Sequence, residues 1–181
     1  MKRLTVTLSA LVLAAGANAQ TYVEVGYTST DYSNSVVVSG HSYDITASPS
    51  AIRGIVGHEF TPNFSLEGML GLGLSSSNLS VSGISTPVDL KIDSIYGVYV
   101  KPKAQVSPDL EVFARVGYAH VRGTSSYQNT SSSSSGNSFS YGLGMSYAIN
   151  KQMSVNFDAM SYYDKNSASA TGTTIGIGYK F

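Results

Sequence analysis

The feature that most restricts the fold of this 181-residue chain is a regular alternation of apolar residues with small or polar ones. The clearest example is FSYGLGMSYAI at residues 139–149, where large apolar side chains alternate with serine and glycine. A period of two is typical of β-strands with two different faces, and no helical period separates the segments. We therefore expect an all-β chain with eight strands. They are expected at residues 21–29, 51–60, 64–74, 90–100, 110–120, 139–149, 154–163 and 176–181.

The connections between these segments are of two kinds that take turns along the chain. Three are short, at residues 61–63, 102–109 and 150–152, and four are long and polar, at residues 30–48, 75–88, 122–137 and 164–170. An even number of strands with short and long connections in alternation predicts an eight-stranded antiparallel up-and-down transmembrane β-barrel. We expect the serine run at residues 131–135 to be a low-complexity loop.

The N-terminus has the layout of an export signal. Met1-Lys2-Arg3 is basic, residues 4–15 are apolar, and Ala17-Asn18-Ala19 matches the small-x-small cleavage pattern. We predict a signal peptide at residues 1–19, cleaved after Ala19, and a single barrel domain at residues 20–181. The chain has no cysteine, so export does not serve a disulfide framework.

Alternation alone does not say which face of the barrel is outside. A lipocalin-like barrel would turn its apolar face inward, whereas an outer-membrane barrel turns it toward lipid. Each charge on a lipid-facing surface would cost up to about 2–4 kcal/mol near the midplane, so the charged face is expected to line the lumen. Only 12% of residues are charged, which suits a lipid-facing exterior. The expected lumen network consists of Glu24, Arg53, Glu59, Glu67, Lys91, Asp93, Glu111, Arg115, Asp158 and Lys180.

Aromatic residues fall at two levels of the expected strands, as in the two aromatic girdles of membrane barrels. Beside the short turns and the chain end are Phe60, Phe64, Tyr147, Tyr179 and Phe181. Toward the long connections are Tyr27, Tyr118, Phe139, Tyr141 and Tyr163.

Several of these stretches resemble a known family. GHEFTPNFSLEG at residues 57–68, ARVGY at residues 114–118 and the final aromatic-x-aromatic pair are similar to the small outer-membrane barrels of the OmpA transmembrane domain, OmpX and opacity-protein group of the porin family. The resemblance implies a place in the bacterial outer membrane, with contacts to its lipid and lipopolysaccharide. It also implies that Gly178, Tyr179 and Phe181 belong to a signal read by the barrel-assembly machinery. Because no further domain follows Phe181, we expect a barrel-only member.

We expect a structural or surface-interaction role, with a mostly plugged lumen and polar extracellular loops that can hold a ligand. The alternative is a narrow ion-conducting channel, which requires water between the lumen charges. A lipid-modifying outer-membrane enzyme is a third reading, and we expect no enzyme. The sequence HSYD, with His41, Ser42 and Asp44, contains the side chains of a serine hydrolase, but a serine beside a histidine is expected by chance in so serine-rich a chain.

Other function classes have little support in the sequence. Without Lys2 and Arg3, nine basic residues face eleven acidic ones, so no basic surplus indicates nucleic-acid binding. The Gly-x-Gly pairs lack the third glycine and the helix of a nucleotide-binding loop. Three scattered histidines, His41, His58 and His120, give no metal-site spacing. We therefore expect no cofactor and no metal.

Overall fold

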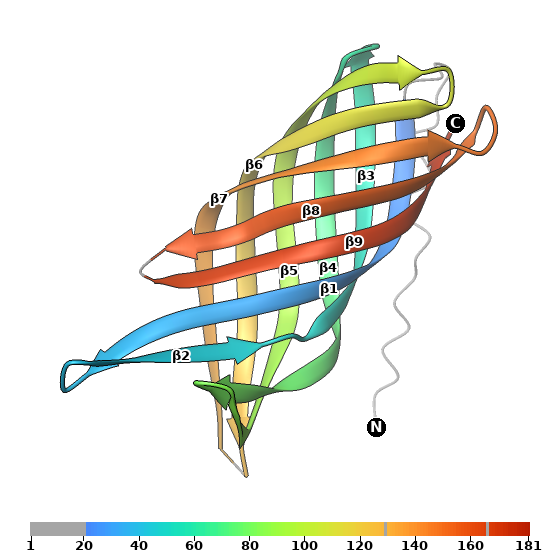
Figure 1. Ribbon diagram of the computed structural model, residues 1–181. Coiled ribbons are helices and arrows are strands. Elements are labelled where there is room, and N and C mark those ends of the chain that lie inside the picture. Colours follow the sequence, from blue (N-terminus) through green and yellow to red (C-terminus); the bar gives the residue numbers. More distant parts are fainter. Residues whose placement is uncertain (1–20, 129, 166) are drawn as a thin grey trace, which may run out of the picture.

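The computed structural model describes residues 21–128, 130–165 and 167–181, and the predicted signal peptide with its cleavage residues Ala17 and Ala19 lies outside them. Within these ranges the chain forms nine antiparallel β-strands (Figure 1), and no helix is long and apolar enough to cross a membrane. The strands are β1 (Thr21–Val38), β2 (His41–Ala47), β3 (Ser50–Thr61), β4 (Phe64–Val81), β5 (Ile84–Ser107), β6 (Leu110–Tyr127), β7 (Thr130–Ala148), β8 (Met153–Lys165) and β9 (Ala168–Lys180).

Eight strand positions close into a barrel, as the alternation predicts. The order β1-β3-β4-β5-β6-β7-β8-β9 returns to β1, whose residues from Tyr22 to Asn34 pair with β9. β2 continues the second strand position beyond β3, because it pairs with β1 and β4 where β3 stops. Pro49 interrupts that position, since proline has no N–H to donate to a ladder. The Thr30 amide and hydroxyl both donate to the Pro49 carbonyl and hold the interruption in place.

The expectation of four long loops is wrong, because these segments are extended β-hairpins. Residues 131–135, expected to be a loop, pair in register with residues 122–126 of β6. The hairpins end in tight turns; Ser39-Gly40 and Ser82-Gly83 have φ of 51°, 79°, 49° and 83°. Two successive residues with positive φ are typical of the turns that join twisted strands. Serine and threonine form such ladders without an apolar face, so composition alone did not distinguish strand from loop.

The barrel therefore has two unlike ends, visible in Figure 1. The turn end carries both described chain termini and the connections at residues 62–63, 108–109 and 149–152. There the Phe181 amide donates to the Thr21 carbonyl across 3.0 Å. The hairpin end carries the four extended hairpins, which spread in different directions beyond the closed barrel.

The alternation reverses toward the hairpin end on two neighbouring strands. The pairing of β4 with β5 is irregular between Leu72 and Ser76, and that of β5 with β6 between Ile92 and Ser94. An extra residue in a strand turns all later side chains to the opposite face. As a result Ile92 is 5% exposed inside the barrel, whereas Lys91 is exposed on the outside.

Large inward side chains lie over glycines on the neighbouring strand, which is how a narrow lumen accommodates them. Tyr99 is the register partner of Gly117, and a Cβ on that glycine would lie 2.0 Å from the Val98 carbonyl oxygen and 2.9 Å from the Tyr99 ring. The same relation joins Tyr22 with Gly57 and Phe113 with Gly144.

We expect Gly117→Ala to destabilise the barrel by about 1–3 kcal/mol, because the neighbouring backbone cannot withdraw from the added methyl group. The measurement is the urea dependence of folding into lipid vesicles. Gly68→Ala is the matched control, since nothing lies within 4 Å of its added Cβ. Equal effects at both positions would contradict the close approach at Gly117.

Candidate functional site

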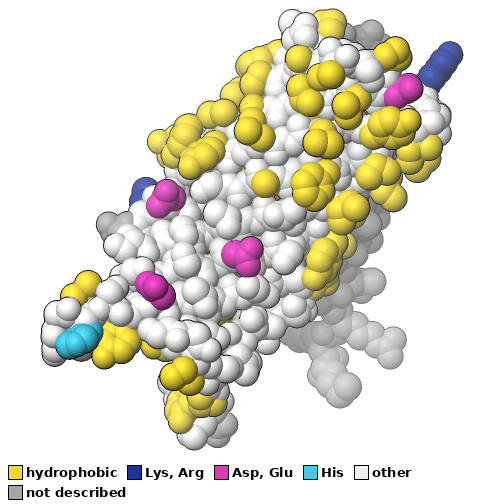
Figure 2. All heavy atoms as spheres, viewed as in Figure 1, with side chains coloured by type: hydrophobic (Ala, Val, Ile, Leu, Met, Phe, Trp, Pro, Cys, Tyr) yellow, Lys and Arg dark blue, Asp and Glu magenta, His cyan; other side chains and the backbone are white. Residues whose placement is uncertain are grey.

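The exterior of the turn-end half is an apolar band. Figure 2 shows apolar side chains gathered over this half, while the hairpin half is mostly polar with scattered acidic side chains. The aromatic residues expected in two girdles are exposed on the outside, except Tyr163, which is half-buried. Exposed aliphatic, methionine and phenylalanine residues between them include Val25, Ile52, Leu66, Leu70, Leu72, Val98, Leu143, Met145, Phe157, Ile175 and Ile177.

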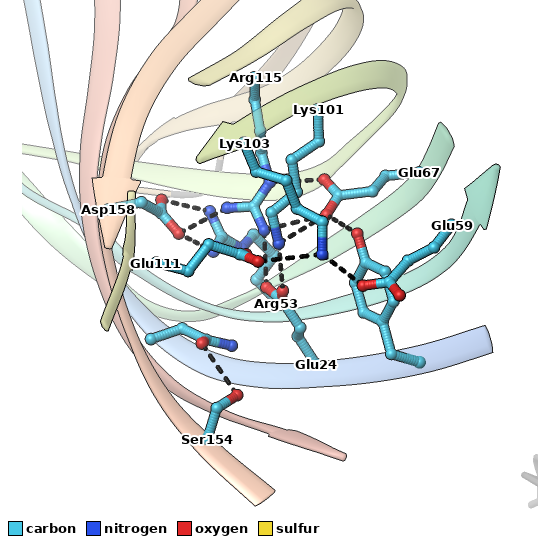
Figure 3. Close-up of polar contacts among 12 residues, drawn as sticks. Glu24, Arg53, Glu59, Glu67, Lys101, Lys103, Glu111, Arg115, Ser154 and Asp158 are labelled. Carbon is cyan, nitrogen blue, oxygen red and sulfur yellow. Dashed lines mark hydrogen bonds and ion pairs between the residues drawn. The ribbon is translucent and has the colours of Figure 1, made fainter. Parts of the chain in front are cut away.

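The interior holds a buried charge network with Arg115 at its centre (Figure 3). Arg115 is 0% exposed, and its guanidinium donates to carboxylates on three other strands. Its Nε lies 2.5 Å from Glu67 Oε2, its Nη1 2.8 Å from Asp158 Oδ2, and its Nη2 2.7 Å from Glu24 Oε2. Arg115 thereby ties β6 to β4, β8 and β1 across the lumen.

Two further cations complete this central network. Arg53 donates to both carboxylate oxygens of Asp158, and also to the Tyr162 hydroxyl at 3.1 Å. Lys101 Nζ lies 3.1 Å from Glu24 Oε1 and 3.4 Å from Glu67 Oε1. Three cations thus face three carboxylates, so each buried charge has a hydrogen-bonded partner of opposite sign, as buried charges require.

A second cluster lies closer to the turn end. Lys103 pairs with Glu59 and, at 3.0 Å, with Glu111, while Lys180 pairs with Glu59. These residues line a cavity of about 170 Å³ together with Lys101 and other polar residues of the rim. Two aromatic rings, Tyr22 and Phe113, flank the Lys101 ammonium with centroids 4.9 and 4.3 Å away. Lys101 therefore marks the boundary between the cavity and the central network.

Lys91 and Asp93 were expected in the lumen network, and the structure places them outside both clusters. Lys91 is exposed on the exterior, and Asp93 accepts a hydrogen bond from Thr124 Oγ1 at 2.6 Å beside Arg122. The physical reason is the irregular pairing of β5 with β6, which moves these side chains out of the alternation of the turn-end part of β5. The structure brings the other eight predicted residues together in the two clusters.

The lumen network expected from the sequence does not include Lys101 or Lys103. The reason is Pro102, which suggests that the strand ends there. In the structure Pro102 is exposed and β5 continues to Ser107. The signal that could have found both lysines is the period of two itself, since Tyr99, Lys101 and Lys103 continue one face.

A cluster of apolar side chains was also missed. On β4, β5, β6 and β8 it follows the network residues toward the hairpin end, and the cavity beside it is only about 10 Å³. A volume of that size holds at most about one water molecule. We call this set the apolar plug; it consists of Ile55, Met69, Ile92, Ile95, Tyr99, Ala119, Met160 and Tyr162.

The other candidates from the sequence are not assembled into sites. On β2, His41 and Ser42 are consecutive and therefore point to opposite faces of the strand. His41 Nδ1 lies 3.3 Å from the Ser39 carbonyl, and Asp44 accepts from the Ser35 hydroxyl at 2.7 Å. No group of three potential metal ligands occurs in the part of the chain that the structure describes.

An apolar exterior band around a closed barrel with charges inside defines a transmembrane β-barrel, because only a closed sheet satisfies its backbone in lipid. The chain belongs to the outer membrane protein beta-barrel domain family, which it matches over residues 4–181. It is therefore a bacterial outer-membrane protein.

Solved structures agree with this fold. Ail, the attachment invasion locus protein of Yersinia pestis, has a TM-score of 0.62 at 16% identity, with 91% of this chain and 100% of Ail covered. Neisserial surface protein A has a TM-score of 0.66 at 13% identity over 89% and 97% of the chains. OprG of Pseudomonas aeruginosa has 0.60 at 14% identity over 92% and 98%. No curated protein sequence matches the chain significantly.

Proposed function

We propose that this protein is a structural outer-membrane barrel that presents polar β-hairpins at the cell surface and conducts no ions. The observation that supports a closed lumen most directly is the balanced network around Arg115, which joins four strand positions across the barrel. Eight strands leave an interior just wide enough for side chains to fill.

The orientation follows from the two unlike ends. Outer-membrane barrels have short turns in the periplasm and longer connections outside the cell. The turn end of this barrel therefore faces the periplasm, and the hairpin end faces outward beyond the lipopolysaccharide layer. The apolar band contacts lipid and the lipid portion of lipopolysaccharide.

The hairpins determine which partners the surface can hold. One structure shows Ail with the heparin analogue sucrose octasulfate. A polyanion fits this chain poorly, because acidic side chains outnumber basic ones on the hairpins. They are Asp31, Asp44, Asp89, Asp93 and Asp164 against Lys91, Arg122 and Lys165. The β6–β7 hairpin instead presents hydroxyl groups, with Ser126 and Ser131 3.0 Å apart, which suits a neutral polar partner such as a glycan.

Shortening the β6–β7 hairpin tests the surface role. Replacing residues 125–132 with Asn-Gly should leave the barrel folded, because the paired residues between this hairpin tip and the turn end are unchanged. We expect the usual mobility shift between unboiled and boiled samples, together with lost binding of cells to immobilised neutral glycans. Substitution of Lys151 by Gln at the turn end is the control. Unchanged glycan binding after the truncation would refute the role of this hairpin.

We propose that Gly178, Tyr179 and Phe181 are read by the barrel-assembly machinery. Tyr179 and Phe181 lie on the exterior with ring centroids 5.2 Å apart, beside the seam where β9 closes on β1. Deletion of Phe181 should reduce the heat-modifiable form in outer membranes while leaving refolding of the purified protein into vesicles intact. Normal assembly of the deletion variant in cells would contradict this role.

We also propose that the protein is not an enzyme. On β2, His41 and Asp44 contact other groups and do not assemble with Ser42 as base and orienting group. The Thr21 hydroxyl lies 3.2 Å from His58 Nδ1, but this exposed pair lies at the turn end, away from the hairpins. Unchanged lipid A after expression of the protein is the expected result, checked by mass spectrometry. A modified lipid A that disappears with His41→Ala would overturn this proposal.

A further inference from the structure

The lumen contains two different barriers in series. The central network of Arg53, Arg115, Lys101 and their carboxylates lies next to the wide turn-end cavity. The apolar plug follows on the hairpin side on β4, β5, β6 and β8. On β4, Met69 comes two residues after Glu67 in that direction; on β6, Ala119 comes four residues after Arg115. On β3 the order is reversed: Arg53 lies two residues nearer the hairpin end than Ile55, and its side chain reaches Tyr162 of the plug.

We propose that the apolar plug is a second permeability barrier in addition to the charge network, and that it sets the barrier to ions from the outside. This inference rests on the closed lumen proposed above. A narrow passage lined by apolar side chains excludes water, and an ion cannot enter without its hydration. The charge network by contrast holds strands together and could admit water if its partners separate.

The packing of the plug supports this separation of roles. Ile55, Met69 and Ile95 are each at most 5% exposed. Met69 and Ile95 line the residual cavity together with Arg53 and Thr28, and that cavity takes about one water molecule. The turn-end cavity of about 170 Å³ is polar and opens toward the rim. Water entering from the periplasmic side thus meets the network first, while water from outside meets the plug first.

Conductance of purified protein in planar bilayers tests the two barriers. The variants are Arg115→Ser for the network, the triple change Ile55→Ser, Met69→Ser and Ile95→Ser for the plug, and their combination. When two barriers lie in series, the one that remains after removal of the other still limits the ion current. We expect the current through each separate variant to stay within about threefold of the background current of the wild type. The current through the combined variant should exceed that background by at least about tenfold. The control for the plug is Ile55→Val, Met69→Leu and Ile95→Val, which keeps the apolar lining.

The outcomes separate this inference from the proposed function. If Arg115→Ser alone conducts as well as the combination, the plug is no barrier and the inference is overturned. A folded combination variant that does not conduct overturns it as well. Open-channel conductance of wild type would instead remove the closed lumen on which both proposals rest.

Thiol labelling gives a second readout that does not require the combined variant to fold. The sequence has no cysteine, so Thr174→Cys introduces a single thiol. Thr174 is 1% exposed and is the register partner of Asp158, at the level of the network. A membrane-impermeant cationic thiol reagent added outside should leave it unlabelled in the wild-type and Arg115→Ser backgrounds and label it in the plug variant. Labelling in the Arg115→Ser background, or none in the plug variant, would refute the plug as a barrier.

Discussion

Arg115→Met should lower the free energy of unfolding by about 3–5 kcal/mol, the largest effect of any single substitution considered for this chain. The methionine keeps most of the volume, but Glu24, Glu67 and Asp158 lose the guanidinium that all three share. Three buried carboxylates then face only Arg53 and Lys101, so one buried negative charge has no cation to balance it and its desolvation is uncompensated. The measurement is the urea midpoint of the heat-modifiable band after refolding into vesicles.

Two comparisons make this result specific to the network. Arg122→Met removes an arginine that is 59% exposed and 3.9 Å from Asp93, and should change stability by about 0.5 kcal/mol or less. Adding Glu67→Gln to Arg115→Met removes one unpaired charge and should recover part of the loss. If the variants at Arg115 and Arg122 cost the same, the buried ion pairs do not stabilise the barrel.

Leu143→Arg should destabilise the barrel by about 2–4 kcal/mol, because it places a charge on the lipid face near the middle of the apolar band. Leu143 is 71% exposed on β7, and Tyr141 and Tyr147 flank it toward the two ends of the band. Ile84→Arg is the matched substitution at the hairpin end, where the Ile84 side chain is 74% exposed. We expect Ile84→Arg to be almost neutral, because that position is surrounded by water.

The expected difference between the two substitutions comes from the surrounding medium, which is lipid at Leu143 and water at Ile84. The exposed fraction of the side chain is nearly equal at the two positions. Folding into vesicles of different acyl-chain length provides the measurement, since the cost at Leu143 should grow with bilayer thickness. A large cost at Ile84 would place the membrane boundary beyond the hairpins. Equal, small costs at both positions would mean that the band does not face lipid.

The barrel and most of the charged interior were predictable because both follow from a period of two. Glu24, Arg53, Glu67, Arg115 and Asp158 alternate with apolar residues, and lipid on one side allows only one assignment of the faces. Two kinds of error occurred where that regularity is interrupted or obscured. Pro102 hid the continuation to Lys103, and the irregular pairing near Ile92 reversed the face of Lys91.

The sequence by itself determined the strand period, the lipid-facing side and the outer-membrane class, because these depend on local alternation and on the cost of charge in lipid. Tertiary structure alone decided which cation meets which carboxylate, since the partners of Arg115 lie 43 to 91 residues away. It also decided that the polar segments pair as hairpins and that Ile55, Met69 and Ile95 form a plug. These contacts depend on how the closed ring staggers its strands, and no local pattern in the chain specifies that stagger.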